Sequence, residues 1–487
     1  MRRTLAGALI ALGLSSCTEA DPLAPDPSEL VVAPSLSFHS VDVLVTNERD
    51  DGPGSFRAAI AAANADPSIG SIALHPRVRT IRLQSGVLFT GPQDLTIDGN
   101  RATVDGSRAS AAAFTVTGGG DLALAHLTFR GAPGEGVLVE VPSTATGVVN
   151  VSLTDITVIG NGGHGVLVND QVDPSTQDDV QPNGAGSDAS VHVEVIDTRF
   201  VRNGYTVSDR DGLRVNEGGL GDLRLTLRRT VADDNAADGI EIDERGAGDV
   251  FIDVSGTQFT RNGKFDPADL DDGFDIDEYD AGGIFGRVFL TTAADNYEEG
   301  FDFNENNAGD LKVDMTLVAA LRNGEEGIDL EEDDDFGGGG DLVTVLRGIT
   351  TIGNGDGADG ALKIREKEDG NLDVTLVSIY SARNTGSGIF VRESSTGSSV
   401  VRIDKAVSTH NTAGVLDPFS KGHGIEVLES GAGDLTGTIS SSAVLSNAGN
   451  GIFGDETGAG AGTVTLTSVT NSDNALGTTG GTATFLP

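Results

Sequence analysis

Several residue types are scarce in this chain of 487 residues, and each scarcity excludes a class of protein or site. The chain has no tryptophan, so it lacks the side chain that usually stacks against sugars in carbohydrate-binding sites. It has one cysteine, Cys17, so no disulfide can form within the chain. Its seven histidines are scattered and form no zinc-binding motif.

Positive charge is also scarce. The chain has 32 lysines and arginines against 74 aspartates and glutamates, which gives a formal net charge of −42. A charge of this size argues against binding nucleic acid or an anionic membrane through the protein surface. It favours either bound cations or a surface selected for solubility.

Glycine, by contrast, is abundant and marks an internal repeat. With Gly239 as the reference, five of the steps between equivalent positions, such as Gly212 to Gly239, are 27 residues long. The reference positions are Gly136, Gly165, Gly212, Gly239, Gly273, Gly300, Gly327, Ala361, Gly388, Gly424 and Gly451. A fixed period in this range predicts a solenoid.

Each repeat contains three short runs in which apolar and polar residues alternate. The first run places apolar side chains one and three residues after the reference glycine, as in Ile240 and Ile242. Alternation with a period of two predicts β-strands, and three strands with three turns leave no room for a helix in the repeat. We therefore predict an all-β fold, a three-sided parallel β-helix, with the right-handed coiling that parallel crossovers usually adopt.

The first residues have the features of a bacterial export signal. Residues 1–17 contain a basic start, an apolar stretch and a small-residue run that ends at Cys17. The run Leu14–Cys17 resembles the bacterial lipobox, in which the cysteine carries the lipid. This resemblance implies that the protein is exported and anchored to a membrane through Cys17, and the following Thr18 favours the outer membrane or cell surface. Residues 18–37 are rich in Pro, Asp and Ser and are predicted to be a disordered tether.

Three motifs after this tether resemble the N-terminal module of bacterial right-handed parallel β-helix repeat proteins. They are Gly54–Asn64, Thr80–Leu83 and Leu95–Gly99. The resemblance implies a capping helix over the first coil, and Ser55 is a plausible N-cap for it. Families with this module include adhesin-like surface proteins and polysaccharide-degrading enzymes, so the module implies a fold and leaves the function open.

These signals divide the chain after the tether into two parts. Residues 38–113 are predicted to form the N-terminal cap and the first irregular coils. Residues 114–487 are predicted to form the β-helix, with its most regular part at 212–474. Insertions such as 204–210 and 263–271 follow the same corner of the repeat, where we expect a binding rim.

An asparagine follows most reference positions after 23 residues. These residues are Asn235, Asn262, Asn296, Asn323, Asn384, Asn411, Asn447 and Asn474, with Asn354 displaced by four positions. The column resembles the asparagine ladders of pectate-lyase-like β-helices, in which stacked amides hydrogen-bond along a turn. We interpret it as structural, with asparagine adopting the left-handed conformation of the turn. The residue before it alternates in charge between Arg202 and Arg322.

A second column, five residues after the reference position, is acidic. It consists of Asp170, Glu217, Glu244, Glu278, Glu305, Glu332, Glu366, Glu393, Glu429 and Glu456. Like charges stacked so closely repel one another unless backbone N–H groups hold each of them or a cation bridges them. We interpret this column as turn-forming.

A local cluster of acidic residues lies two and four residues after the reference glycines of four successive coils. We call it the acidic face, and its members are Glu241, Asp243, Asp275, Asp277, Asp302 and Asp329. The alternation places these side chains on the outer side of their sheet, and Asp238, Asp272, Glu299 and Glu326 add to them. Carboxylates stacked about 4.8 Å apart can share a Ca²⁺ ion. We predict that this face binds Ca²⁺, and a solubilising face is the alternative. The calcium-binding nonapeptide of toxin-type β-rolls is absent, so no motif identifies the metal.

Two functions remain open from the sequence. The first is a non-enzymatic, lipid-anchored surface protein, expected to be monomeric, that binds cations, glycans or a surface-protein ligand through the acidic face. The second is a Ca²⁺-dependent polysaccharide lyase or glycoside hydrolase acting on an acidic polysaccharide. Its candidate catalytic residues are Arg214 and Lys363, which border the face, and Asp275 and Asp302 within it.

Overall fold

The computed structural model describes residues 41–170, 186–267, 270–333, 338–355, 360–367, 369–414 and 421–487. The predicted signal segment, the tether and Cys17 lie outside the described residues. Residues 41–487 form one compact unit. Its described part contains one helix and 42 strands, and no helix in that part has the length and apolarity needed to cross a bilayer.

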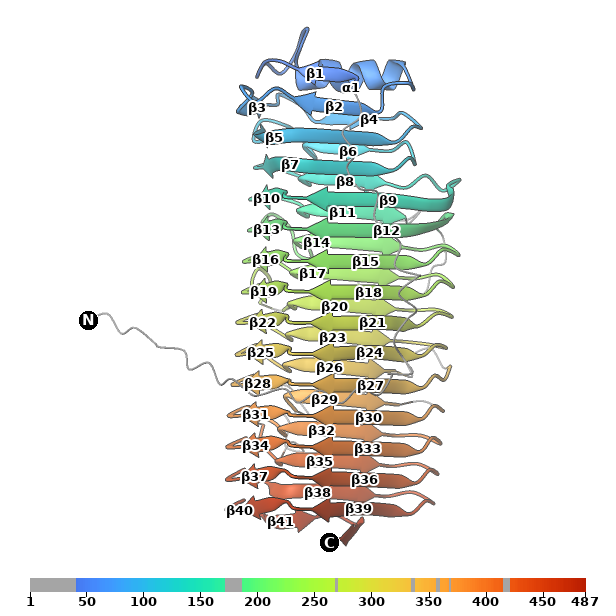
Figure 1. The fold of residues 1–487 in the computed structure, drawn as a ribbon, viewed down its shortest axis with the longest axis vertical. Helices are drawn as coiled ribbons and strands as arrows, with labels where there is room; N and C mark the ends of the chain where they lie inside the picture. The colour runs from blue at the N-terminus through green and yellow to red at the C-terminus, as the bar shows by residue number, and fades with distance from the viewer. Residues whose placement is uncertain are drawn as a thin grey trace, which may run out of the picture. The chain divides into compact units, whose positions relative to one another are not determined.

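The strands stack in parallel, each pairing with the equivalent strands of the coils before and after it (Figure 1). One coil consists of β14 (Leu213–Glu217), β15 (Leu223–Arg228) and β16 (Val231–Asp233). These pair in register with β17 (Ile240–Glu244), β18 (Val250–Ser255) and β19 (Gln258–Thr260) of the next coil. The structure is therefore an all-β, three-sided parallel β-helix, as the repeat predicts.

One side of the β-helix is a 14-stranded sheet. Besides β14 and β17, its strands are β4 (Val87–Phe89), β6 (Phe114–Val116), β8 (Val137–Glu140), β11 (Val166–Asp170), β20 (Phe274–Glu278), β23 (Phe301–Glu305), β26 (Ile328–Glu332), β29 (Leu362–Glu366), β32 (Ile389–Glu393), β35 (Ile425–Glu429), β38 (Asn450–Glu456) and β41 (Gly477–Gly480).

The other two sides belong to one 28-stranded sheet. Its longer strands, besides β15 and β18, are β1 (Val43–Val45), β2 (Ser71–Leu74), β5 (Leu95–Asp105), β7 (Leu122–Arg130), β9 (Thr146–Thr154), β12 (Asp188–Ile196), β21 (Ile284–Phe289), β24 (Leu311–Thr316), β27 (Leu342–Arg347), β30 (Leu372–Val377), β33 (Ser399–Asp404), β36 (Leu435–Ser440), β39 (Gly462–Thr467) and β42 (Thr484–Leu486). The shorter strands, besides β16 and β19, are β3 (Thr80–Arg82), β10 (Thr157–Ile159), β13 (Arg199–Val201), β22 (Thr292–Ala294), β25 (Ala319–Leu321), β28 (Thr350–Ile352), β31 (Tyr380–Ala382), β34 (Val407–Thr409), β37 (Ala443–Leu445) and β40 (Thr470–Ser472).

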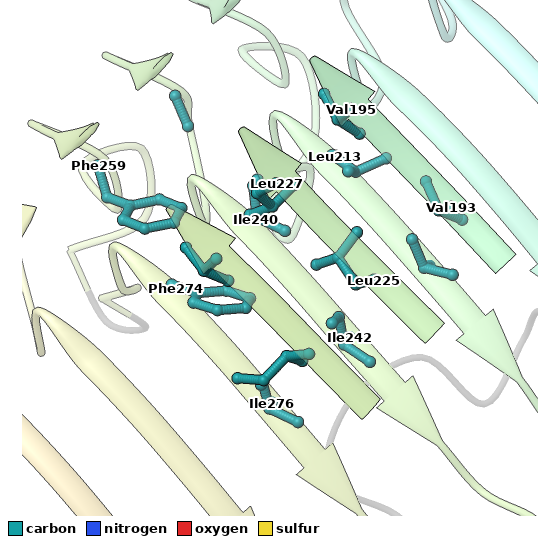
Figure 2. Packing of buried hydrophobic residues seen from close by; sticks show 14 of the residues in the cluster. Val193, Val195, Leu213, Leu225, Leu227, Ile240, Ile242, Phe259, Phe274 and Ile276 are labelled. Carbon is teal, nitrogen blue, oxygen red and sulfur yellow. The ribbon is translucent and has the colours of Figure 1, made fainter. Parts of the chain in front are cut away.

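Apolar side chains from all three sides fill the interior (Figure 2). Ile240 and Ile242 of β17 point inward, as do Leu225 and Leu227 of β15, and all four are buried. The ring of Phe259 on β19 stacks against that of Phe274 on β20, the first strand of the next coil, with the centroids 5.1 Å apart. Burying a side chain of this size contributes about 1.5–3 kcal/mol, so the repeated apolar positions hold successive coils together.

The predicted capping helix is α1 (Phe56–Ala65), which lies at the N-terminal end of the stack (Figure 1). It begins after Ser55, whose hydroxyl accepts a hydrogen bond from the backbone N–H of Ala58 at 3.2 Å. Phe56 is buried and its ring lies 5.9 Å from that of Phe114. The helix thereby covers the apolar interior of the first coils, which an open end of a solenoid requires.

The asparagine column forms a continuous ladder. The side-chain amide of Asn235 donates to Asn262 Oδ1, and that of Asn262 donates to Asn296 Oδ1, both at 3.0 Å. Asn354, displaced in sequence, accepts from Asn323 at 3.1 Å and so belongs to the same ladder. The structural role predicted for the column is confirmed.

The left-handed residue of this turn is the one before the asparagine. Arg261 and Asp295, for example, both have φ of 60°. The prediction that asparagine itself takes this conformation is wrong, because its side chain must point inward to bond the ladder. The alternating charges pair in part: Arg322 lies 2.6 Å from Asp295, whereas Arg261 pairs with Asp233.

Candidate functional site

The acidic face stacks in register along the 14-stranded sheet. Glu241 on β17 is the Cα partner of Asp275 on β20, which is followed by Asp302 on β23 and Asp329 on β26. These residues alternate with core positions such as Ile242, so their side chains leave the opposite side of the sheet. The column predicted from the repeat is therefore present.

The structure differs from the sequence-based prediction in how far this face is exposed. Asp243, Asp329 and Glu241 are only 1%, 3% and 6% exposed, and Asp275 and Asp302 are half-buried. Asp277 is also half-buried. Three of the six carboxylates are therefore buried and three are partly exposed.

Loops account for part of this burial. The segment between β13 and β14 brings Asp209 against the sheet, where its Oδ1 lies 2.8 Å from Arg214 Nη1. Tyr205 of this loop packs edge-to-face against Phe265 of the equivalent loop two coils further on, with centroids 5.9 Å apart. The insertions that follow the asparagine corner therefore contact one another, as expected from their common position in the repeat.

The N-terminal end of the acidic face is neutralised by Arg214. Its guanidinium lies 2.7 Å from Glu241 Oε2 and 2.5 Å from Asp243 Oδ2. Arg245 adds a second contact to Asp243, at 3.1 Å from Oδ1. Burial disfavours the charged form of Arg214, but the attraction of Asp243 and Glu241 outweighs it and raises the arginine pKa further above its usual value.

The C-terminal end is neutralised in the same way. Lys363 Nζ lies 2.5 Å from Asp329 Oδ2 and 3.0 Å from Glu331 Oε2, and Arg365 lies 2.5 Å from Glu331 Oε1. Burial acts to raise the pKa of Glu331, but Lys363 and Arg365 overcome that effect and lower it. The basic residues that border the face in sequence are therefore its counter-ions in space.

Between these ends, three carboxylates converge without such a cation. One oxygen each from Asp272, Asp275 and Asp302 lies within 4.8 Å of the others, and we call these residues the central triad. Asp275 Oδ1 and Asp302 Oδ1 are buried and have no hydrogen-bond donor among the described residues. Asp272, which precedes its reference glycine, accepts the backbone N–H of Glu299 at 2.6 Å through Oδ1.

Further carboxylate groups adjoin the central triad. They are Asp238 with Glu241 and Asp275, Asp272 with Glu298 and Glu299, and Glu299 with Glu325 and Glu326. Successive groups share a member, so candidate ligands continue from coil to coil. The sequence shows an acidic residue before each reference glycine of the acidic face. It does not show that these residues converge with Asp275 and Asp302.

The electrostatics of the central triad show an excess of negative charge. Burial raises the pKa of Asp275 well above its usual value, and Asp277, Asp238 and Asp302 raise it further. Burial, followed by the charges of Asp329 and Asp272, raises the pKa of Asp302 well above its usual value. Burial also raises the pKa of Asp272, to about 6. A bound cation would reverse these shifts by favouring the ionised carboxylates.

Two of the candidate catalytic residues, Lys363 and Arg214, act as counter-ions in this structure. Burial opposes the charge of Lys363, but Asp329 and Glu331 outweigh burial and raise the lysine pKa well above its usual value. Burial likewise opposes the charge of Arg214, and Asp243 and Glu241 outweigh it and raise the arginine pKa. A general base must give up its proton before it can accept one, and these ion pairs oppose that loss.

The turn-forming interpretation of the glutamate column is confirmed. Glu244 Oε1 accepts the backbone N–H of Gly246 at 3.0 Å, and Glu429 Oε1 accepts that of Gly431 at 2.8 Å. The same contact, two residues ahead, recurs at Glu393 with Ser395 at 2.8 Å. Each carboxylate thus closes the turn that follows its strand.

Comparison with known proteins adds one structural likeness. The chain is similar to the crystal structure of pectate lyase Pel9A, with 18% sequence identity, coverage of 63% of this chain and 76% of that chain, and a TM-score of 0.42. No protein-family profile matches the chain, and no curated protein matches it.

Proposed function

We propose that this chain is a cation-binding β-helix of the bacterial exterior, that Ca²⁺ is its ligand, and that the central triad is the main binding site. The observation that carries the proposal is the pair of buried, donor-less oxygens on Asp275 and Asp302, in a face whose two ends are already neutralised. Carboxylate oxygens are the ligands that Ca²⁺ prefers. Asp238 and Glu299 lie in adjoining carboxylate groups, Asp238 with Asp275 and Glu299 with Asp272.

The proposal includes the lipid anchor. The lipobox-like segment that ends at Cys17 supports export and attachment to a membrane, with the β-helix on the outer side. In that setting the acidic face would meet the millimolar Ca²⁺ concentrations at which extracellular sites are commonly loaded. A cation held between carboxylates could also serve as the contact for an acidic glycan or a surface-protein ligand.

We favour this binding role over a polysaccharide lyase. A lyase of the Ca²⁺-dependent kind would use the same carboxylates but would need a nearby base, and Arg214 and Lys363 are both engaged in ion pairs. Incubation of the chain with acidic polysaccharides and Ca²⁺ should therefore yield no unsaturated products. Sustained release of such products would establish the enzymatic function instead.

Calorimetric titration with CaCl₂ tests the proposal, in NaCl of constant ionic strength because salt alone screens repulsion. The wild type should bind Ca²⁺, and its melting temperature should rise with free Ca²⁺, since a ligand that binds only the folded form stabilises it by about 2.7 kcal/mol at a hundredfold excess over Kd. The double variant Asp275→Asn/Asp302→Asn should lose both effects.

A matched control removes the same charge elsewhere. Asp197 and Asp373 lie on the 28-stranded side, where each pairs with an exposed arginine. Asp197→Asn/Asp373→Asn should bind Ca²⁺ like the wild type. If Ca²⁺ acts no differently from NaCl on the wild type, or if both double variants lose binding equally, the proposed site is wrong.

A further inference from the structure

The glutamate column inside the β-helix has a second property that its turn-forming role does not explain. We call Glu217, Glu244, Glu278, Glu305, Glu332, Glu366, Glu393, Glu429 and Glu456 the glutamate ladder. Each ends a strand of the 14-stranded sheet, on the side that faces the core. From Glu217 to Glu429 every member is at most 1% exposed, so a column of carboxyl groups runs through the interior.

Seven members of the ladder have one carboxyl oxygen that accepts a hydrogen bond and one that has no donor among the described residues: Glu217, Glu244, Glu278, Glu305, Glu393, Glu429 and Glu456. The backbone N–H two residues ahead binds the first oxygen, as between Asn307 and Glu305 Oε1 at 3.3 Å. The second oxygen, for example Oε2 of Glu244, Glu278 and Glu305, is buried and has no donor in the described part of the chain. An unsatisfied buried oxygen is costly, and more so when it is charged.

The groups next to these second oxygens are other carboxyls of the ladder. Glu244 is the Cα partner of Glu217 on one neighbouring strand and of Glu278 on the other, and Glu278 is the Cα partner of Glu305. Towards the C-terminus Glu393 is stacked on Glu429 in the same register. Two ionised carboxylates are both acceptors and cannot bond each other, so a hydrogen bond between stacked members requires a proton.

The strongest charged neighbours of Glu217, Glu244 and Glu278 are acidic. Outside the ladder they are Asp170, beyond Glu217, and Asp280, beside Glu278. Arg245 follows Glu244 in sequence, but its guanidinium is bound to Asp243 at 3.1 Å. The backbone of the adjoining turns packs directly against the ladder. For example, a Cβ atom added at Gly309 would lie 3.0 Å from Glu305 Oε1.

We propose that the glutamate ladder holds protons at neutral pH, with neighbouring glutamates joined by hydrogen bonds in which a carboxylic acid donates to the next carboxyl oxygen. A proton shared by two acids satisfies both unsatisfied oxygens and removes the repulsion between them, as in pairs of acids that share one proton. A Ca²⁺ ion needs six to eight oxygens. Among the described residues, the groups of three acids that converge on one point contain no ladder member.

The pKa shifts of the ladder agree with this geometry and determine how the stability of the protein depends on pH. Burial raises the pKa of Glu393 to about 7 and that of Glu244 well above the usual value. The folded protein therefore binds more protons than the unfolded chain, in which glutamate titrates near 4.3. The stabilisation is complete below that value and is lost as the pH rises through the folded-state pKa values, which burial raises to about 7 for Glu393 and to about 10 for Glu305. The ladder therefore makes stability fall towards alkaline pH.

The experiment uses the full chain carrying Asp275→Asn/Asp302→Asn, with EDTA present, so that neither Asp275, Asp302 nor bound metal contributes. Infrared spectra of this parent at pH 8 should show the band of protonated carboxyl groups, and its melting temperature should fall from pH 5 to pH 8. Each retained proton changes the unfolding constant by about tenfold per pH unit.

Glu278→Gln in this background identifies the source of the protons. The glutamine carbonyl can accept the backbone N–H of Asp280, as Glu278 does at 3.3 Å, and its amide supplies the donor permanently. The infrared band should weaken, and the loss of stability from pH 5 to pH 8 should become smaller. Glu194→Gln, on the 28-stranded side, is the control and should change neither.

Two results would overturn the inference. One is a parent without a protonated-carboxyl band at pH 8. The other is Glu278→Gln with the same band and the same pH profile as its parent. If Glu278→Gln fails to fold, Glu305→Gln replaces it, because Glu241 and other buried carboxyls outside the ladder also contribute to a band in the parent. Neither result bears on whether the wild-type central triad binds Ca²⁺.

Discussion

Asp275 on β20 and Asp302 on β23 are Cα partners on neighbouring strands, and each has one buried oxygen without a donor among the described residues. The pairs on either side contain a counter-ion, Arg214 against Glu241 and Lys363 against Asp329. The chain therefore pairs the carboxylates at the two ends of a continuous column with cations, whereas the described residues form no ion pair with Asp275 or Asp302. Under the proposed function, this contrast would direct an external cation to the central triad rather than to the whole face.

Removal of charge at the centre should stabilise the metal-free protein. In EDTA, Asp275→Asn/Asp302→Asn should raise the free energy of unfolding by on the order of 1 kcal/mol, because it relieves repulsion that raises both pKa values. Denaturant unfolding at pH 7.5 measures the change. A decrease in stability would show that these carboxylates are satisfied in the metal-free state.

Removal of the cation at the N-terminal end should have the opposite effect. Arg214→Met leaves Glu241 and Asp243 buried with less compensation, and breaking a buried ion pair in this way costs about 3–5 kcal/mol. Arg229→Met, which breaks an exposed pair with Asp197, should cost about 1 kcal/mol or less. Denaturant unfolding of both variants tests the difference, and equal losses would argue against a structural role for the Arg214 cluster.

Ca²⁺ binding should weaken in acid. Burial raises the pKa of Asp272 to about 6 and those of Asp275 and Asp302 well above the usual value, so protons compete with the metal for the same oxygens. The Ca²⁺ affinity should therefore fall as the pH is lowered from 8 to 5. Titrations across this range measure it, and a constant affinity would place the ligand at groups other than the central triad.

Cys17 should carry a lipid. Metabolic labelling with a fatty acid should mark the wild type, and Cys17→Ser should be unlabelled and should leave the membrane fraction. Equal labelling of the two proteins, or of neither, would contradict the lipobox assignment.

The sequence by itself determined the architecture, because a β-helix is periodic and its core is local to each coil. The alternation around Ile240 and Ile242 specified the strands and their inward side, and the recurring asparagines specified the ladder. Since every coil stacks on the next at the same register, one correct repeat assignment placed Asp275 beside Asp302 without any knowledge of long-range contacts.

Only the tertiary structure decided which of the acidic residues are buried and which of them form ion pairs with a lysine or arginine. Alternation shows the side of a sheet from which a side chain leaves, but it does not show where a loop of irregular length will lie. Contacts such as Asp209 with Arg214, and Tyr205 with Phe265, depend on how the insertions fold across the coils. The same holds for Glu278 and Glu305, whose burial against turn backbone depends on close packing that periodicity does not encode.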